Sequence, residues 1–149
     1  MKNSIQHKFF FNHSPEMVWE YLTTAELIEQ WLMKNNFQLK LNHSFQFSIT
    51  AVPELDFDGN VYCTVLEIIP LKKLVYSWKC GPGKGIITLD SIVEWTLHAK
   101  ENGTELSLNH TGFTEKNLKL YTEMFTGWLI HIQRINENIN AANYATTKV

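Results

Sequence analysis

The side chains best suited to chemistry in this sequence are its six histidines. They stand at positions 7, 13, 43, 98, 110 and 131, and no two form an HxH or HExxH pair. Those spacings bring two imidazoles to the same side of a strand or helix, where they can share a zinc ion. We therefore expect neither a metal site nor a bound cofactor.

His110 is the histidine most relevant to a site, because strand alternation points it inward with Leu106 and Leu108. One interpretation makes it a polar anchor or a proton shuttle in a cavity. The other makes it a buried imidazole that is hydrogen-bonded to the backbone near the turn at Gly112. We favour the second interpretation.

Catalytic nucleophiles and paired acids are not evident. The sequence contains no GxSxG or SxxK motif. Cys63 and Cys80 fall on neighbouring predicted strands, and we interpret them as two buried free thiols. Asp56 and Asp58 lie in a loop, where solvation is the expected state. Glu67 shares strand parity with inward residues, but its place near a hairpin end favours exposure. No constellation that would carry catalysis is evident, which favours a protein that is not an enzyme but leaves the question open.

The N-terminal third predicts one strand and two short helices. Residues 4–11 read as a strand that ends in three phenylalanines. Ser14 and Pro15 are typical of a helix start, as N-cap and first helical residue. The run from Thr23 to Glu26 fits a capping box, so a second helix should extend to about Met33.

From residue 36 to residue 111 the apolar residues recur at every second position, as in half-buried strands. The first strand has an inward face made of Phe45, Phe47, Ile49 and Ala51. A loop over 53–58 and a hairpin over 59–69 and 73–80 follow. Consecutive strands with short turns predict an antiparallel meander.

A long helix should follow Thr114, which fits an N-cap. Its apolar stripe recurs every three or four positions and contains Leu118, Tyr121, Phe125, Trp128, Leu129, Ile132, Ile135 and Ile139. Gly127 lies in the middle of this helix, where glycine costs about 1 kcal/mol relative to alanine. We expect the helix backbone to approach a large ring there, and the tail after about Asn140 to fray.

Composition limits the partners and the location. The 149 residues suit a single domain over 1–149. The net charge of −2 and the scattered Lys and Arg disfavour nucleic acid and anionic membrane surfaces as partners. The sequence shows neither an apolar signal core nor an 18-residue apolar run, so we expect a soluble, cytoplasmic protein.

Five segments, in order, resemble one known family. They are FNHSPEMVW at 11–19, LIEQW at 27–31, LVYSW at 74–78, GTELSLNHTGF at 103–113 and GW at 127–128. Together they resemble the START-like, or SRPBCC, superfamily, in the branch named after the C-terminal domain of the activator of Hsp90 ATPase. The match spans nearly the whole chain. It departs at Asn42 and His43, where the family often has glycine, which affects only the turn assigned there.

The resemblance implies an α+β helix-grip fold, in which a curved antiparallel sheet surrounds a long C-terminal helix and encloses an apolar cavity. We expect a cavity of about 300–1,000 Å³ beside the N-terminal half of the helix. Its lining should contain Trp31, Phe37, Phe45, Phe47, Tyr76, Trp78, Trp95, Leu108, His110, Leu118, Tyr121 and Phe125.

Three functions follow from these observations. The first is binding of a small hydrophobic or amphipathic ligand, with the protein a monomer or homodimer. The second, from the family name, is a stress-response role with an Hsp90-type chaperone as partner. The eukaryotic co-chaperone, however, binds the chaperone through an additional domain for which this chain has no room. The third is a cyclase- or hydrolase-type enzyme, as in other branches, and the missing polar cluster weakens it.

Overall fold

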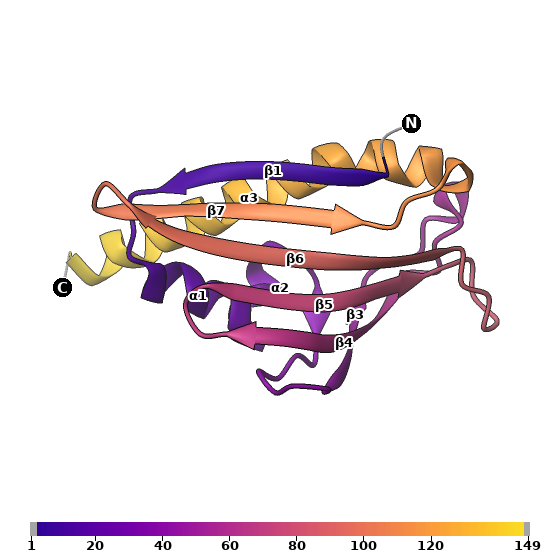
Figure 1. The fold of residues 1–149 in the computed structure, drawn as a ribbon, viewed down its shortest axis with the longest axis horizontal. Coiled ribbons are helices and arrows are strands. Elements are labelled where there is room, and N and C mark those ends of the chain that lie inside the picture. Colours follow the sequence, from indigo (N-terminus) through magenta and orange to yellow (C-terminus); the bar gives the residue numbers. More distant parts are fainter. Residues whose placement is uncertain (1–2, 148–149) are drawn as a thin grey trace.

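The computed structural model describes residues 3–147, with side chains through residue 143. Seven strands form one antiparallel sheet in the order β1-β7-β6-β5-β4-β3-β2 (Figure 1). The strands are β1 (Ser4–Phe11), β2 (Lys34–Asn35), β3 (Ser44–Ser48), β4 (Asn60–Ile69), β5 (Lys73–Cys80), β6 (Leu89–Lys100) and β7 (Gly103–Thr111). β1 pairs with β7, so the first strand completes the sheet beside the last.

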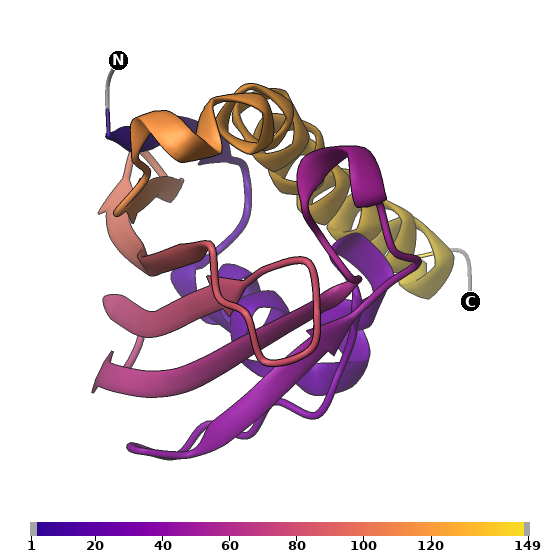
Figure 2. The ribbon, with the colours of Figure 1, turned by 90° about the vertical axis from the view of Figure 1, so that its right-hand side faces the viewer.

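Helices lie on the concave side of this curved sheet (Figure 2). They are α1 (Pro15–Thr23), α2 (Ala25–Trp31) and α3 (Leu118–Thr147), with short 3-10 turns η1 (Pro53–Leu55) and η2 (Glu115–Asn117). α3 contacts β1, α1 and α2, so it closes the open side of the curve. This arrangement confirms the α+β helix-grip fold. The long helix continues to Thr147, beyond Asn140, where we expected fraying to begin.

The starts of the two short helices differ in their capping. Ser14 caps α1 as predicted, because its hydroxyl accepts a hydrogen bond from the Met17 backbone N–H at 3.2 Å. The predicted capping box at Thr23 is wrong. Thr24 is the N-cap of α2 and makes no side-chain cap bond. The Thr23 hydroxyl instead donates to the Trp19 carbonyl at 2.8 Å, within α1.

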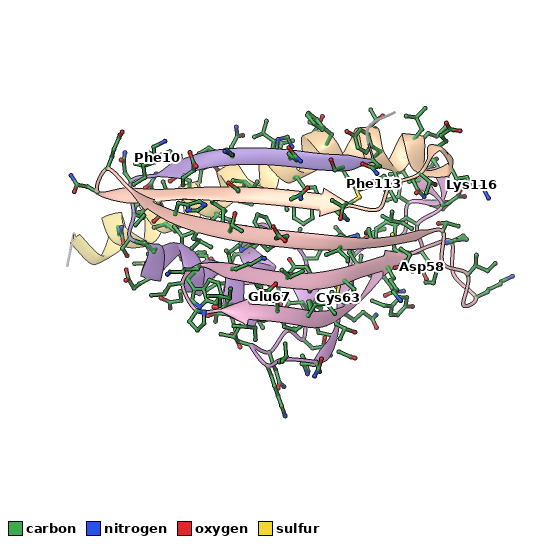
Figure 3. The ribbon with its side chains drawn as sticks, viewed as in Figure 1. Phe10, Asp58, Cys63, Glu67, Phe113 and Lys116 are labelled. Carbon is green, nitrogen blue, oxygen red and sulfur yellow. The ribbon has the colours of Figure 1, made fainter. Side chains whose placement is uncertain are left out.

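Strand alternation holds within β3 and β4 except at two places. β3 ends at Ser48, so Ile49 and Ala51 are exposed rather than buried with Phe47. In β4 the pairing register shifts between Val65 and Glu67. This bulge interrupts the parity that pointed Glu67 inward. The side chain of Glu67, which is labelled in Figure 3, is 46% exposed. It pairs with Lys73 at 3.3 Å.

The predicted stripe of α3 is correct only toward its C-terminal half. Ile132, Ile135 and Ile139 are fully buried, whereas Leu118 and Phe125 are about half exposed, at 55% and 44%. Residues seven apart on a straight helix drift by about 20° per heptad. This drift is too small to expose Leu118 by itself. The N-terminal half of α3 lies along the edge strand β1, where Phe125 packs on His7, and the buried residues there are Leu120 and Trp128.

Candidate functional site

A pocket of about 440 Å³ lies between α3 and the segment that carries η1. Figure 2 shows these two parts side by side at one end of the sheet. The lining is almost entirely apolar. It consists of Leu32, Met33, Ile49, Thr50, Ala51, Val52, Leu55, Phe57, Val61, Trp78, Cys80, Leu120, Glu123, Met124, Gly127, Trp128 and His131.

The outer wall, residues 49–57, is an ordered loop. Within this loop, Val52 and Phe57 form an isolated β-bridge in which the Val52 N–H donates to the Phe57 carbonyl at 2.8 Å. The Ile49 N–H donates to the carbonyl of Gly59 at 2.8 Å. Gly59 has φ of +95°, and a Cβ there would clash with the Ile49 carbonyl oxygen, so this turn requires glycine.

The same wall is fixed to the end of β5. The Asp58 backbone N–H donates to the Gly81 carbonyl at 2.8 Å, and Figure 3 places Asp58 at that end of the sheet. The Asp58 carboxylate accepts the Asn60 N–H at 2.9 Å. Asp58 therefore acts as a turn residue and is not one of the residues that line the pocket.

The floor is formed by the ring of Trp78 on β5 and that of Trp128 on α3, whose centroids are 5.3 Å apart. Cys80 lies on the floor beside them as a free thiol. Burial raises the pKa of Cys80 to about 12. Because the thiolate is the reactive form, this neutral thiol contributes apolar surface and not a nucleophile.

The carboxylate and the imidazole of the lining both come from α3. Glu123 is exposed at the rim, and His131 is partly buried. Burial lowers the pKa of His131, which keeps the imidazole neutral near pH 7. Its Nδ1 is buried and has no hydrogen-bond partner within the described residues. No Lys or Arg is among the lining residues.

Gly127 lies in the middle of α3, but the surroundings predicted for it from the sequence are wrong. A Cβ built there meets no atom within 4 Å, so the helix backbone does not press against a ring. Gly127 lines the pocket instead. The expected close approach is therefore wrong.

Of the twelve residues expected to line the cavity, Trp78 is a pocket residue. Seven others are buried and pack on one another as core: Trp31, Phe37, Phe45, Phe47, Tyr76, Trp95 and Leu108. The centroids of Phe45 and Tyr76 are 5.3 Å apart, and those of Trp31 and Trp95 are 5.9 Å apart. The Trp95 indole N–H donates to the Tyr76 hydroxyl at 3.0 Å. These rings fill the space that we had assigned to the cavity.

His110 is fully buried, as alignment with Leu106 and Leu108 predicted, but its partners are side chains rather than backbone. Its Nδ1 accepts from the Trp128 indole at 3.0 Å, and its Nε2 lies 2.8 Å from Ser91 Oγ. The Ser91 hydroxyl donates to the Trp78 carbonyl at 2.7 Å. The imidazole must therefore donate to Ser91 rather than take its proton. This Ser–His pair is not arranged for nucleophilic catalysis.

The other three predicted residues lie elsewhere on α3. Leu118 and Phe125 face outward, and the Phe125 ring packs on His7 of β1 with centroids 4.7 Å apart. The Tyr121 hydroxyl donates to the Ser4 carbonyl at 2.9 Å. These contacts fasten α3 to the edge strand β1 and do not shape the pocket.

The outer wall and the α3 lining of the pocket were not predicted from the sequence. One signal in the sequence could have indicated the outer wall. The loop contains three apolar residues, Val52, Leu55 and Phe57, and so many apolar side chains in a short loop favour packing against another surface. Their spacing has no strand or helix period, so no pattern indicated which surface that is.

Within residues 3–143, no three His, Cys, Asp or Glu side chains are grouped so that they could hold a metal ion. Nor does any helix in the described part of the chain combine the length and apolar character needed to span a membrane.

Comparison with known families gives a match over residues 12–140. The family is described as activator of Hsp90 ATPase homolog 1-like protein, or AHSA1. The chain belongs to the AHSA1 family. No curated protein matches the sequence significantly.

Solved structures of other proteins share this fold, and two of the three below are under 25% identical and show the fold alone. Protein MLL2253 from Mesorhizobium loti is 30% identical, with a TM-score of 0.82 over 93% of this chain and 97% of that chain. BH1534 from Bacillus halodurans is 24% identical, with a TM-score of 0.71 over 90% and 94%. The Aha1 dimer from Colwellia psychrerythraea is 17% identical, with a TM-score of 0.69 over 90% and 93%, and it shows the shared fold alone.

Proposed function

We propose that this protein binds a small hydrophobic or amphipathic molecule in the pocket between α3 and residues 49–57. The observation that carries the proposal is the pocket itself, about 440 Å³ of largely apolar lining. This volume falls within the range of about 300–1,000 Å³ that is typical of small-molecule sites. The walls come from β5, α3 and a hydrogen-bonded loop, so the pocket shape is largely preformed.

The polar groups of the pocket favour binding over catalysis. Glu123 and His131 are eight residues apart on α3, which is about 12 Å along a helix axis. No hydrogen bond or ion pair between them is found among the described residues. The lining therefore offers no pair of side chains in the hydrogen-bonded arrangement of an activated nucleophile and its base.

Binding can be tested with Nile red, a neutral apolar dye, by fluorescence titration. The variant Met124→Trp places a large ring in the pocket, and Phe125→Trp makes the same addition one residue away, outside it. We expect wild type and Phe125→Trp to bind the dye alike and Met124→Trp to bind at least tenfold more weakly. Melting temperatures verify that both variants fold. Unchanged binding by a folded Met124→Trp would contradict the proposal.

The family description is the observation that favours a chaperone role. We expect that adding this protein to a cognate Hsp90 changes its ATPase rate less than twofold, which corresponds to about 0.4 kcal/mol in the barrier. A saturable stimulation of several fold would establish the chaperone role instead.

A further inference from the structure

We infer that the pocket selects an amphipathic molecule whose polar group donates hydrogen bonds and carries no negative charge, and that this molecule lies across the α3 backbone at Gly127. The inference rests on the proposed binding function and specifies its ligand class. Three observations support it: an open glycine, a stripe of polar groups on one helix face, and the charge of the lining.

Gly127 is the first observation. Mid-helix glycine destabilises a helix by about 1 kcal/mol relative to alanine. At many glycines a crowded neighbour explains the choice, but a Cβ at Gly127 meets no atom within 4 Å. The space that it leaves belongs to the pocket. Glycine here keeps the helix backbone open to whatever occupies the pocket, a use for which glycine is suited.

The second observation is the spacing of Glu123, Gly127 and His131. Residues four apart share one helix face, so these three form a single stripe with the glycine between the two polar residues. The exposed Glu123 carboxylate accepts hydrogen bonds only. The His131 imidazole keeps one nitrogen without a partner among the described residues. That nitrogen is closed to solvent, so a molecule crossing at Gly127 would meet the Glu123 carboxylate as its hydrogen-bond acceptor, with the His131 ring beside it.

The rest of the lining supplies the apolar complement. Trp78, Leu120, Met124 and Trp128 cover the remaining space with rings and aliphatic groups. A ligand with an apolar body and a polar edge therefore fits better than a uniformly polar one.

Charge is the third observation. The lining contains the Glu123 carboxylate and no Lys or Arg. A carboxylate or phosphate in the pocket would be desolvated beside a like charge with no cation to pair with it, which is unfavourable. A hydroxyl or an ammonium group would instead find an acceptor at Glu123.

Three probes with one ring system separate these cases: 2-naphthol, 2-naphthylmethylammonium and 2-naphthoate, titrated at pH 7.5 by calorimetry. We expect the neutral and cationic probes to bind at least tenfold more tightly than the anion. Glu123→Gln should reduce this preference at least threefold. The control Glu137→Gln removes an exposed acid elsewhere on α3 and should leave it unchanged. Equal or tighter binding of naphthoate to wild type would overturn the inference.

The role of Gly127 has its own pair of variants. Gly127→Leu fills the open space and should weaken binding of 2-naphthol at least tenfold while raising the melting temperature. Thr126→Leu introduces the same leucine at the neighbouring exposed position and should leave 2-naphthol binding unchanged. Undiminished binding to Gly127→Leu would overturn the inference.

Nile red binding distinguishes a wrong ligand class from a wrong binding function. If wild type binds Nile red but prefers naphthoate or tolerates leucine at 127, the ligand class is wrong and the binding function stands. If wild type binds neither Nile red nor any naphthalene probe, both fail.

Discussion

Among single residues, His110 shows most clearly how burial determines chemistry. Burial lowers the pKa of His110 to about 3, from an ordinary value near 6.5. The folded protein therefore holds the imidazole neutral across a pH range in which the unfolded chain protonates it. Its hydrogen bonds to Ser91 and Trp128 leave no space for a second ring proton on Nδ1.

Stability should consequently fall as the pH drops below 6.5. A folded-state pKa below the unfolded value means that the unfolded state binds more protons between pH 6.5 and about 3, so acid favours unfolding. We expect the free energy of unfolding to be about 2 kcal/mol lower at pH 5 than at pH 7 from this residue. Urea unfolding of wild type and of His110→Gln at pH 5 and pH 7 measures this difference in the free energy of unfolding. A His110→Gln profile as steep as wild type would contradict this account.

A substitution at Tyr76 tests whether this residue belongs to the core or lines the pocket. Tyr76→Phe leaves the buried Trp95 indole N–H without its acceptor, which should cost about 1–3 kcal/mol of stability. Because Tyr76 is not a pocket residue, Nile red affinity should stay within twofold of wild type. Tyr62→Phe, at an exposed tyrosine, serves as the control for both measurements. A tenfold loss of dye affinity without a loss of stability would place Tyr76 in the site.

At the scale of elements, capping offers a matched test on adjacent helices. Ser14→Ala removes the acceptor of the Met17 N–H and should cost about 1 kcal/mol of unfolding free energy. Thr24→Ala removes no side-chain cap bond at the start of α2 and should cost well under half as much. Thermal or urea unfolding compares them. Equal losses for the two variants would show that the Ser14 bond is unimportant.

Element types were predictable from the sequence, because the signals are local. Alternation defined β4 and β5 almost to the residue, and Ser14 with Pro15 located the start of α1. The failures needed information that a pattern does not carry. The bulge before Glu67 resets the alternation of β4. Leu118 and Phe125 are exposed because this half of α3 lies along the edge strand β1, which the helical period does not reveal.

At the scale of the whole molecule, the general position of the cavity was predictable and its lining was not. The pocket lies beside the N-terminal half of α3, as a curved sheet and a straight helix require. Strand parity indicates which rings point inward but not whether they meet. Here Phe45, Tyr76 and Trp95 meet and fill the middle of the sheet, so the space remains at the end, behind residues 49–57.

Whether the end pocket is the binding site can be seen residue by residue in an NMR titration with 2-naphthol. Two-dimensional spectra resolve backbone amides and the indole N–H groups of the five tryptophans. We predict that the largest shifts occur at residues 50–57 and 120–131 and at the indoles of Trp78 and Trp128. The indole of Trp19, which is buried elsewhere, should not move. Saturable shifts confined to other surfaces, or no shifts at millimolar 2-naphthol, would show that the end pocket is not the binding site.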